Sequence, residues 1–136
     1  MNRTDFQKLA RMRVREPKAL LESGHFSGAY YLAGYSVECA LKSCIAKSTA
    51  RHDFPDKHRV QESHTHNLLS LLKLADLQSQ FTQDKGQNPI LAGNWNTVQQ
   101  WSETSRYSIK TQVEAQEIVR AITGRSGVMR WVTQRW

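Results

Sequence analysis

The sequence predicts an all-α fold, an up-down bundle of four to five helices that forms one domain over residues 1–136. Apolar residues recur at steps of three and four along much of the chain, as on the buried face of a helix. No segment shows the alternation of apolar and polar residues that is typical of a half-buried strand. The segment 24–47, GHFSGAYYLAGYSVECALKSCIAK, is the longest helix-compatible run and contains no proline, so we expect it to be the central helix.

The composition is that of a globular protein, with 39% hydrophobic and 23% charged residues among 136. A chain of this length buries a core without disulfides or metals to support it. It contains no apolar run of about 18 residues, so we expect no membrane span. The first residues, MNRTDFQKLARMRV, lack the apolar stretch of a secretory signal, so we expect a cytoplasmic protein. The net charge of +7 favours anionic partners, nucleic acid first.

A first helix is expected before the central one. Thr4 or Asp5 can cap its start, and Ser23-Gly24 ends it, with Gly24 suited to a left-handed backbone conformation. Pro17 lies inside the apolar pattern and either kinks one long helix or starts a second one after a break. Because the central helix follows directly, the two are expected to form an antiparallel hairpin.

The central helix carries two lines of residues at helical spacing. The apolar line predicts the buried face: Phe26, Ala29, Tyr30, Ala33, Val37, Ala40, Leu41 and Cys44. A second line lies on roughly the opposite side, since successive residues are about 100° apart, and consists of Tyr31, Tyr35, Glu38 and Lys42. We expect this second face to meet a ligand, a partner or solvent.

Two polar loops are expected in the second half, over residues 48–63 and 78–93. Between them, a short leucine-rich helix begins at Thr65 or Asn67. A further element, capped by Asn94 or Asn96, has Trp95, Val98 and Trp101 on its apolar edge. After a break at 104–108, the last helix runs from about Thr111 to the end and is weakened by Gly124 and Gly127.

The two cysteines predict neither a disulfide nor a metal site. Cys39 and Cys44 are five positions apart on one helix and point in different directions. No second Cys/His pair at zinc spacing accompanies them. We therefore expect both thiols to fill the core, and we expect no cofactor.

Three segments in this order resemble the HEPN family, the higher-eukaryote and prokaryote nucleotide-binding domain. They are GAYYLAGYSVECALKSCIAK, HTHNLLSLL and WSETSRYS before a last helix, and the resemblance covers about 19–122. It implies an all-α bundle that is usually a homodimer. Many members are ribonucleases of toxin–antitoxin or other defence systems, and others are non-catalytic RNA- or nucleotide-binding modules. The matching residues are Tyr35, Glu38, Leu41 and Lys42, then His66, Leu68 and Leu69, then Arg106 and Tyr107.

The ribonuclease motif of this family is Arg, four to six residues, then His near the start of the last main helix. Here that position holds Arg106 with no histidine after it. The spacing recurs in or beside the 48–63 loop, as Arg51 to His58, Arg59 to His64 and Arg59 to His66. Arg59 and His64 are therefore the catalytic candidates, and a solvated charged loop is the alternative. For His66 we expect a capping or packed polar role.

The binding candidates are placed around one polar cleft, in which Arg106 pairs with Glu38 or binds phosphate: Tyr31, Tyr35, Glu38, Lys42, Arg106 and Tyr107. The alternative is a simple helical pair between Glu38 and Lys42. The sequence thus predicts an RNA- or nucleotide-associated domain that lacks the usual nuclease motif. Two alternatives remain open, a metal-independent endoribonuclease and an interaction module that pairs with a nucleotidyltransferase.

Overall fold

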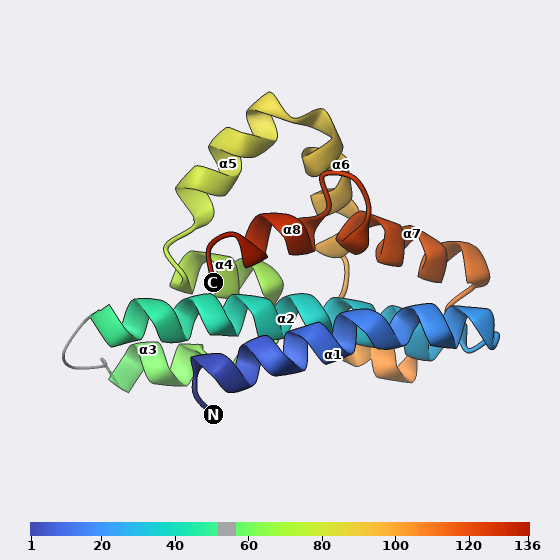
Figure 1. The fold of residues 1–136 in the computed structure, drawn as a ribbon, viewed down its shortest axis with the longest axis horizontal. Coiled ribbons are helices and arrows are strands. Elements are labelled where there is room, and N and C mark those ends of the chain that lie inside the picture. Colours follow the sequence, from blue (N-terminus) through green and yellow to red (C-terminus); the bar gives the residue numbers. More distant parts are fainter. Residues whose placement is uncertain (52–56) are drawn as a thin grey trace.

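The computed structural model describes residues 1–51 and 57–136, with side chains for 1–49 and 60–136. These residues contain helices and no strand, so the all-α prediction is confirmed (Figure 1). The elements are α1 (Arg3–Glu22), α2 (Phe26–Arg51), α3 (Lys57–Glu62), α4 (Leu68–Leu74), α5 (Gln78–Gln87), α6 (Pro89–Val98), the 3-10 helix η1 (Glu103–Tyr107), α7 (Gln112–Thr123) and α8 (Val128–Thr133). Within these ranges no helix is both long enough and apolar enough to cross a membrane.

α1 and α2 form the antiparallel hairpin that the sequence predicts, and they lie side by side along the length of the molecule (Figure 1). Gly24 makes the turn between them at φ +79°, a left-handed conformation that glycine adopts without steric cost. The start of α1 differs from the prediction. Asn2 caps it, since its side chain accepts from the Asp5 amide while the Asp5 carboxylate accepts from the Asn2 amide, both at 3.0 Å.

α1 continues through Pro17 as a single helix, so no second helix starts there. A proline inside a helix removes one backbone hydrogen bond. Pro17 is fully buried, so its ring contributes packing that offsets this loss.

Most of the remaining helices lie on one side of α2, whereas α3 and η1 lie on the other side in the view of Figure 1. α4, η1, α7 and α8 all contact α2, while α5 and α6 arch over the far side (Figure 1). The ring of Phe81 from α5 meets those of Trp95 and Trp131 edge-on, at centroid distances of 5.0 and 4.6 Å. Trp95, Val98 and Trp101 are all buried, but α6 ends at Val98, so Trp101 lies in the segment between α6 and η1 and not on the predicted helix.

The two predicted loops are largely helical, which is a correction. α2 extends to Arg51 and α3 occupies 57–62, while 52–56 lie outside the described residues. The segment 78–93 holds α5 and the start of α6. Asn88 caps α6 by accepting from the Leu91 amide at 3.1 Å, and Pro89 takes the first helical position. The proline therefore marks a helix start rather than a loop.

The last helix is two helices, α7 and α8, separated by a turn over 124–127. Ser126 has a φ of 51°, and Asn94 of α6 donates to the carbonyl oxygens of Arg125 and Ser126 at 3.2 and 2.9 Å. The glycines thus break the predicted helix instead of weakening it. Together with α3 and α5, this break gives the described chain more and shorter helices than the four to five expected.

Candidate functional site

The second line of α2 is covered by the rest of the chain instead of facing solvent. Tyr31, Tyr35 and Lys42 are partly buried, and Glu38 is only 1% exposed. η1 and α4 both contact α2 and supply the cover. The predicted need for a partner on this face is therefore met largely within the chain.

Glu38 is the centre of a buried polar cluster. Its Oε1 accepts from Lys42 Nζ at 2.8 Å, one turn further along α2. The same oxygen lies 2.9 Å from Nδ1 of His66, which precedes α4. Because a carboxylate oxygen only accepts, the His66 ring carries its hydrogen on Nδ1 and exposes Nε2 as an acceptor when neutral. We call Glu38, Lys42 and His66 the Glu38 cluster.

Burial of the Glu38 carboxylate costs free energy. The second carboxylate oxygen, Oε2, is buried and has no hydrogen-bond partner among the described residues. An ionised group without water costs several kcal/mol unless nearby charges and hydrogen bonds offset the cost. Lys42, whose side chain is 16% exposed, and the 46% exposed His66 provide that offset and link the cluster to the surface.

The two tyrosines belong to a packed aromatic group. The rings of Tyr31 and Tyr35 stack at 6.1 Å, and Trp101 lies 6.0 Å from Tyr31. The indole N–H of Trp101 donates to the Tyr31 carbonyl oxygen at 3.1 Å. Burial, followed by the neighbouring Cys39 and Glu38, raises the pKa of Tyr35. These contacts give the tyrosines a role in holding η1 and its preceding segment on α2.

Arg106 and Tyr107 contact each other and do not belong to the Glu38 cluster. Both side chains are exposed, and the Arg106 guanidinium stacks over the Tyr107 ring at 5.0 Å. Among the described residues Arg106 forms no ion pair with Glu38, whose partners are Lys42 and His66. The expected pairing of Arg106 with Glu38 is not formed, and phosphate binding by Arg106 stays a prediction.

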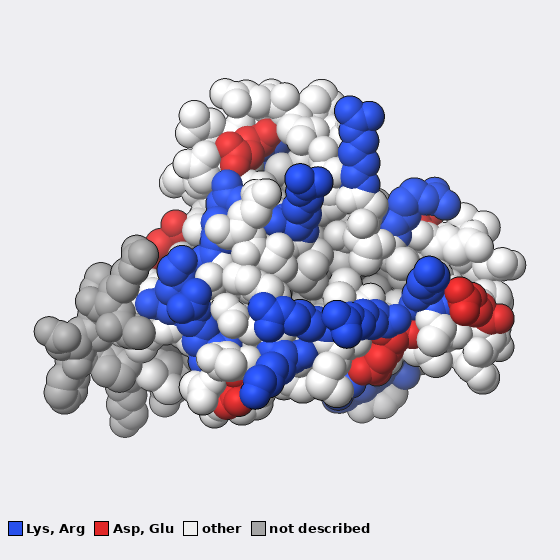
Figure 2. All heavy atoms as spheres, viewed as in Figure 1, with Lys and Arg blue, Asp and Glu red and all other residues white. Residues whose placement is uncertain are grey.

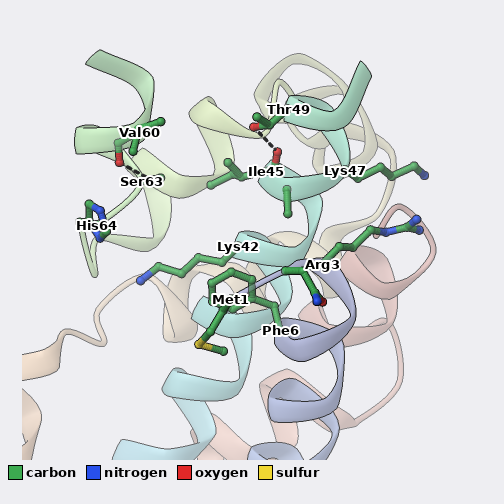
Figure 3. A pocket seen from close by; sticks show the side chains of 12 residues that line it. Met1, Arg3, Phe6, Lys42, Ile45, Lys47, Thr49, Val60, Ser63 and His64 are labelled. Carbon is green, nitrogen blue, oxygen red and sulfur yellow. Dashed lines mark hydrogen bonds between the residues drawn. The ribbon is translucent and has the colours of Figure 1, made fainter. Parts of the chain in front are cut away.

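A pocket of about 850 Å³ opens beside the Glu38 cluster, between the start of α1, the second half of α2 and residues 60–64. Phe6, Ile45 and Val60 give it apolar walls. Lys42 and His64 lie on one side of it and Arg3 and Lys47 on the other (Figure 3). The tips of Arg3 and Lys47 donate to the main-chain oxygens of Trp136 and Arg135, at 2.6 and 3.3 Å.

The catalytic candidates are only partly placed. His64 is exposed and lies at this pocket. The side chain of Arg59 lies outside the described residues, as do those of Arg51, His52 and His58. His66, the third histidine at the motif spacing, belongs to the Glu38 cluster.

The two cysteines and Trp131 have structural roles. Cys39 and Cys44 are free and buried, and burial raises the pKa of each thiol to about 11. Trp131 is buried, and its N–H donates to Asp84 Oδ2 at 2.8 Å. In the part of the chain that the structure describes, no three His, Cys, Asp or Glu side chains gather as metal ligands.

Sequence reasoning missed the contact between Glu38 and His66, which joins segments 28 positions apart. One signal was present, since both residues belong to the motifs that resemble the HEPN family. Comparisons with models of protein families, with curated proteins and with solved structures find no match.

Proposed function

We propose that this protein is a HEPN-like domain that binds RNA or a nucleotide. One observation carries the proposal, the 2.9 Å contact between Glu38 and His66. These residues come from the first two of the three segments on which the sequence resemblance rests. The helical pattern within each segment does not by itself bring Glu38 and His66 together. A fold shared with the HEPN family would bring them together, because both residues belong to the motifs that resemble this family. The contact therefore supports the assignment more strongly than helix content alone.

The neighbouring pocket suits a nucleotide in size and chemistry. Its volume of about 850 Å³ lies within the range of roughly 300–1,000 Å³ common for small-molecule sites. The walls formed by Phe6, Ile45 and Val60 can cover a base or ribose. Arg3 and Lys47 supply positive charge that attracts a phosphate group.

Binding of AMP and of a short single-stranded RNA at low salt tests the proposal. Wild-type protein is expected to bind both, and Lys47→Gln to bind AMP about tenfold more weakly, because one hydrogen bond to a charged group is lost. Lys73→Gln is the matched control, since Lys73 is an exposed lysine on α4 that does not line this pocket. If the wild-type protein binds neither probe at low salt, the proposal fails.

A metal-independent endoribonuclease is the second candidate, and His64 at the pocket favours it. A histidine there can take the proton of a ribose 2′-hydroxyl as this oxygen attacks the adjacent phosphorus, while the bond from phosphorus to the 5′-oxygen of the next nucleotide breaks and this leaving oxygen takes a proton from water. RNA cleavage that persists in EDTA and is lost in His64→Ala, with RNA binding retained, would support the enzyme. Full cleavage by His64→Ala would exclude His64 as the catalytic residue.

A non-catalytic module that pairs with a nucleotidyltransferase is the third candidate. The exposed side chains of Tyr107 and Ile109 favour a protein partner. In the setting that the resemblance implies, a prokaryotic toxin–antitoxin or defence system, such a partner is encoded nearby. Co-purification with the neighbouring gene product, without RNA, would favour this candidate over RNA binding.

A further inference from the structure

Four basic residues form a stripe along the exposed side of α1. Lys8, Arg11, Arg15 and Lys18 follow one another at steps of three, four and three, which places them on one helix face. All four are exposed. At a rise of 1.5 Å per residue the stripe is about 15 Å long. We call these four residues the α1 stripe.

Within the described residues, ion pairs leave most of the charge of the α1 stripe unbalanced. α1 contains six basic and three acidic residues, a difference of +3. Asp5 is engaged in the helix cap and Glu16 pairs with Arg13. Lys8, Arg15 and Lys18 form no ion pair within the described residues. Like charges three and four residues apart repel one another on a helix, so an anion bound along the stripe would relieve this repulsion.

The basic surface continues beyond α1. Three more exposed arginines follow along the chain: Arg120 on α7, Arg125 in the following turn and Arg130 on α8. α7 contacts α1. Figure 2 shows Lys and Arg side chains along α1 and over the helices above it, with fewer acidic side chains between them. The extent of this face exceeds that of a single small anion, so it suits a polyanion.

An aromatic ring lies within this basic face. The Arg11 guanidinium sits 4.9 Å from the centroid of the partly exposed Trp136 ring. Aromatic rings and guanidinium planes are the groups on which unpaired bases stack in proteins that bind single-stranded nucleic acid. The pair adds a base-binding element to a surface that otherwise recognises charge.

We propose that the α1 stripe, with the arginines beside it, binds the phosphate backbone of single-stranded RNA. This inference rests on the proposed function and extends it from a nucleotide to a chain. Phe6 and Arg3 place the pocket at the N-terminal end of α1, and the stripe begins at Lys8, two residues after Phe6 along the chain. In a stacked strand, which rises about 3.4 Å per nucleotide along its axis, 15 Å of stripe spans about four nucleotides.

A lipid surface fits this face less well. The apolar side of α1 faces the core, where Ala10 and Pro17 are buried. Met12 is the large exposed apolar side chain between the stripe residues. A helix that lies in a membrane surface presents a broad apolar face beside its basic one.

The test is the salt dependence of RNA binding by the triple variant Lys8→Gln, Arg15→Gln, Lys18→Gln. The probe is a labelled twelve-nucleotide single-stranded oligoadenylate, followed by fluorescence anisotropy. For single strands each phosphate contact contributes about 0.7 to the slope of log Kobs against log salt, so we expect the slope to shrink by about 2. Affinity at low salt should fall at least tenfold, while AMP binding stays unchanged. Lys73→Gln should retain the wild-type slope.

Four outcomes oppose the inference, and they are distinguishable. If the triple variant, folded by circular dichroism, keeps the wild-type slope and affinity, RNA does not contact the stripe, and the proposed function stands. If polyglutamate of equal charge competes as well as RNA, the partner is an acidic protein. If vesicles with anionic lipids bind more tightly than RNA, the partner is a membrane. If the wild-type protein binds neither AMP nor RNA, the proposed function fails as well.

Discussion

The contact between α2 and Trp101 depends on the absence of a side chain at position 34. A Cβ atom on Gly34 would overlap the Trp101 ring, which is 3% exposed and held by its hydrogen bond to Tyr31. We expect Gly34→Ala to lower the free energy of unfolding by about 1–3 kcal/mol, the usual cost of overpacking a buried site. Urea denaturation measures this change.

Gly93→Ala is the matched control for Gly34→Ala. Gly93 is exposed inside α6, and a Cβ there meets nothing within 4 Å. Alanine at such a helical site raises the free energy of unfolding by roughly 0.5–1 kcal/mol. Opposite signs for the two substitutions are the expected result. An equally stable Gly34→Ala protein would contradict the packing of Trp101 on α2.

Asp84 should make stability fall in acid. A hydrogen bond from Trp131, another from Gln80 and the charge of Arg135 hold the pKa of Asp84 below its ordinary value. The stabilisation is complete above the unfolded-state pKa of about 3.9 and is lost as the pH falls through the lower folded-state pKa. The difference in Tm between wild type and Asp84→Asn should therefore be constant above about pH 5 and shrink below about pH 4. A difference that stays constant down to pH 3 would show that Asp84 is not stabilised as an anion.

The sequence predicts apolar contacts at this scale better than polar ones. Trp95 and Val98 are buried because any apolar residue on the inner side of a helix has the same environment, whichever helix covers it. The Glu38–His66 contact requires one particular placement of the segment before α4, which helical periodicity does not encode. For Arg106 the sequence left two roles open, pairing with Glu38 or binding phosphate; among the described residues Glu38 pairs with Lys42 and His66, and phosphate binding stays a prediction.

At the scale of elements, helices with a repeated apolar stripe are predictable and the others are not. α1, α2 and α4 each have such a stripe and lie close to their expected positions, and α7 begins where expected but ends at Thr123. α5 buries one residue, Phe81, so its sequence shows no period. Its contacts with Trp95 and Trp131 come from distant parts of the chain. Because the contacts that stabilise α5 come from distant residues, its own sequence has the polar composition of a loop.

Asn88 should stabilise two elements at once. Its Oδ1 accepts from the Leu91 amide and caps α6, while its Nδ2 donates to Ser126 Oγ in the turn before α8, both at 3.1 Å. Asn88→Ala is expected to lower the free energy of unfolding by about 1–2 kcal/mol, as for other lost caps. Asn88→Asp keeps the cap acceptor and loses only the donor, so its loss should be smaller.

Asn96→Ala is the control for Asn88, because Asn96 is exposed inside α6 and does not cap it. Chemical denaturation should show almost no loss for this variant, since alanine favours the helix. A loss for Asn88→Ala no larger than that for Asn96→Ala would mean that the cap is not formed.

At the scale of the whole molecule, the α1 stripe and the most exposed apolar side chains of the described residues lie in different segments. The net charge of +7 predicts an anionic partner, but only the fold assigns the α1 stripe to one exposed face. Among the residues whose side chains are described, the most exposed large apolar ones apart from Met1 are Ile109 at 96%, Tyr107 at 79% and Val113 at 61%. They are neighbours in the segment from η1 to α7. Clustered apolar exposure of this kind is typical of protein–protein contact sites.

We expect the homodimer that the sequence resemblance implies to use this 107–113 surface. Ile109→Asp places a charge where the interface would exclude water, so it should shift the protein from dimer to monomer. Sedimentation velocity over a range of concentrations measures the shift. Ile90→Asp, at a half-exposed position on α6, adds the same charge elsewhere and should leave the dimer intact. A dimer that survives Ile109→Asp would have its interface on another surface. A wild-type protein that stays monomeric would leave the 107–113 surface free to bind a different protein, as the nucleotidyltransferase candidate requires.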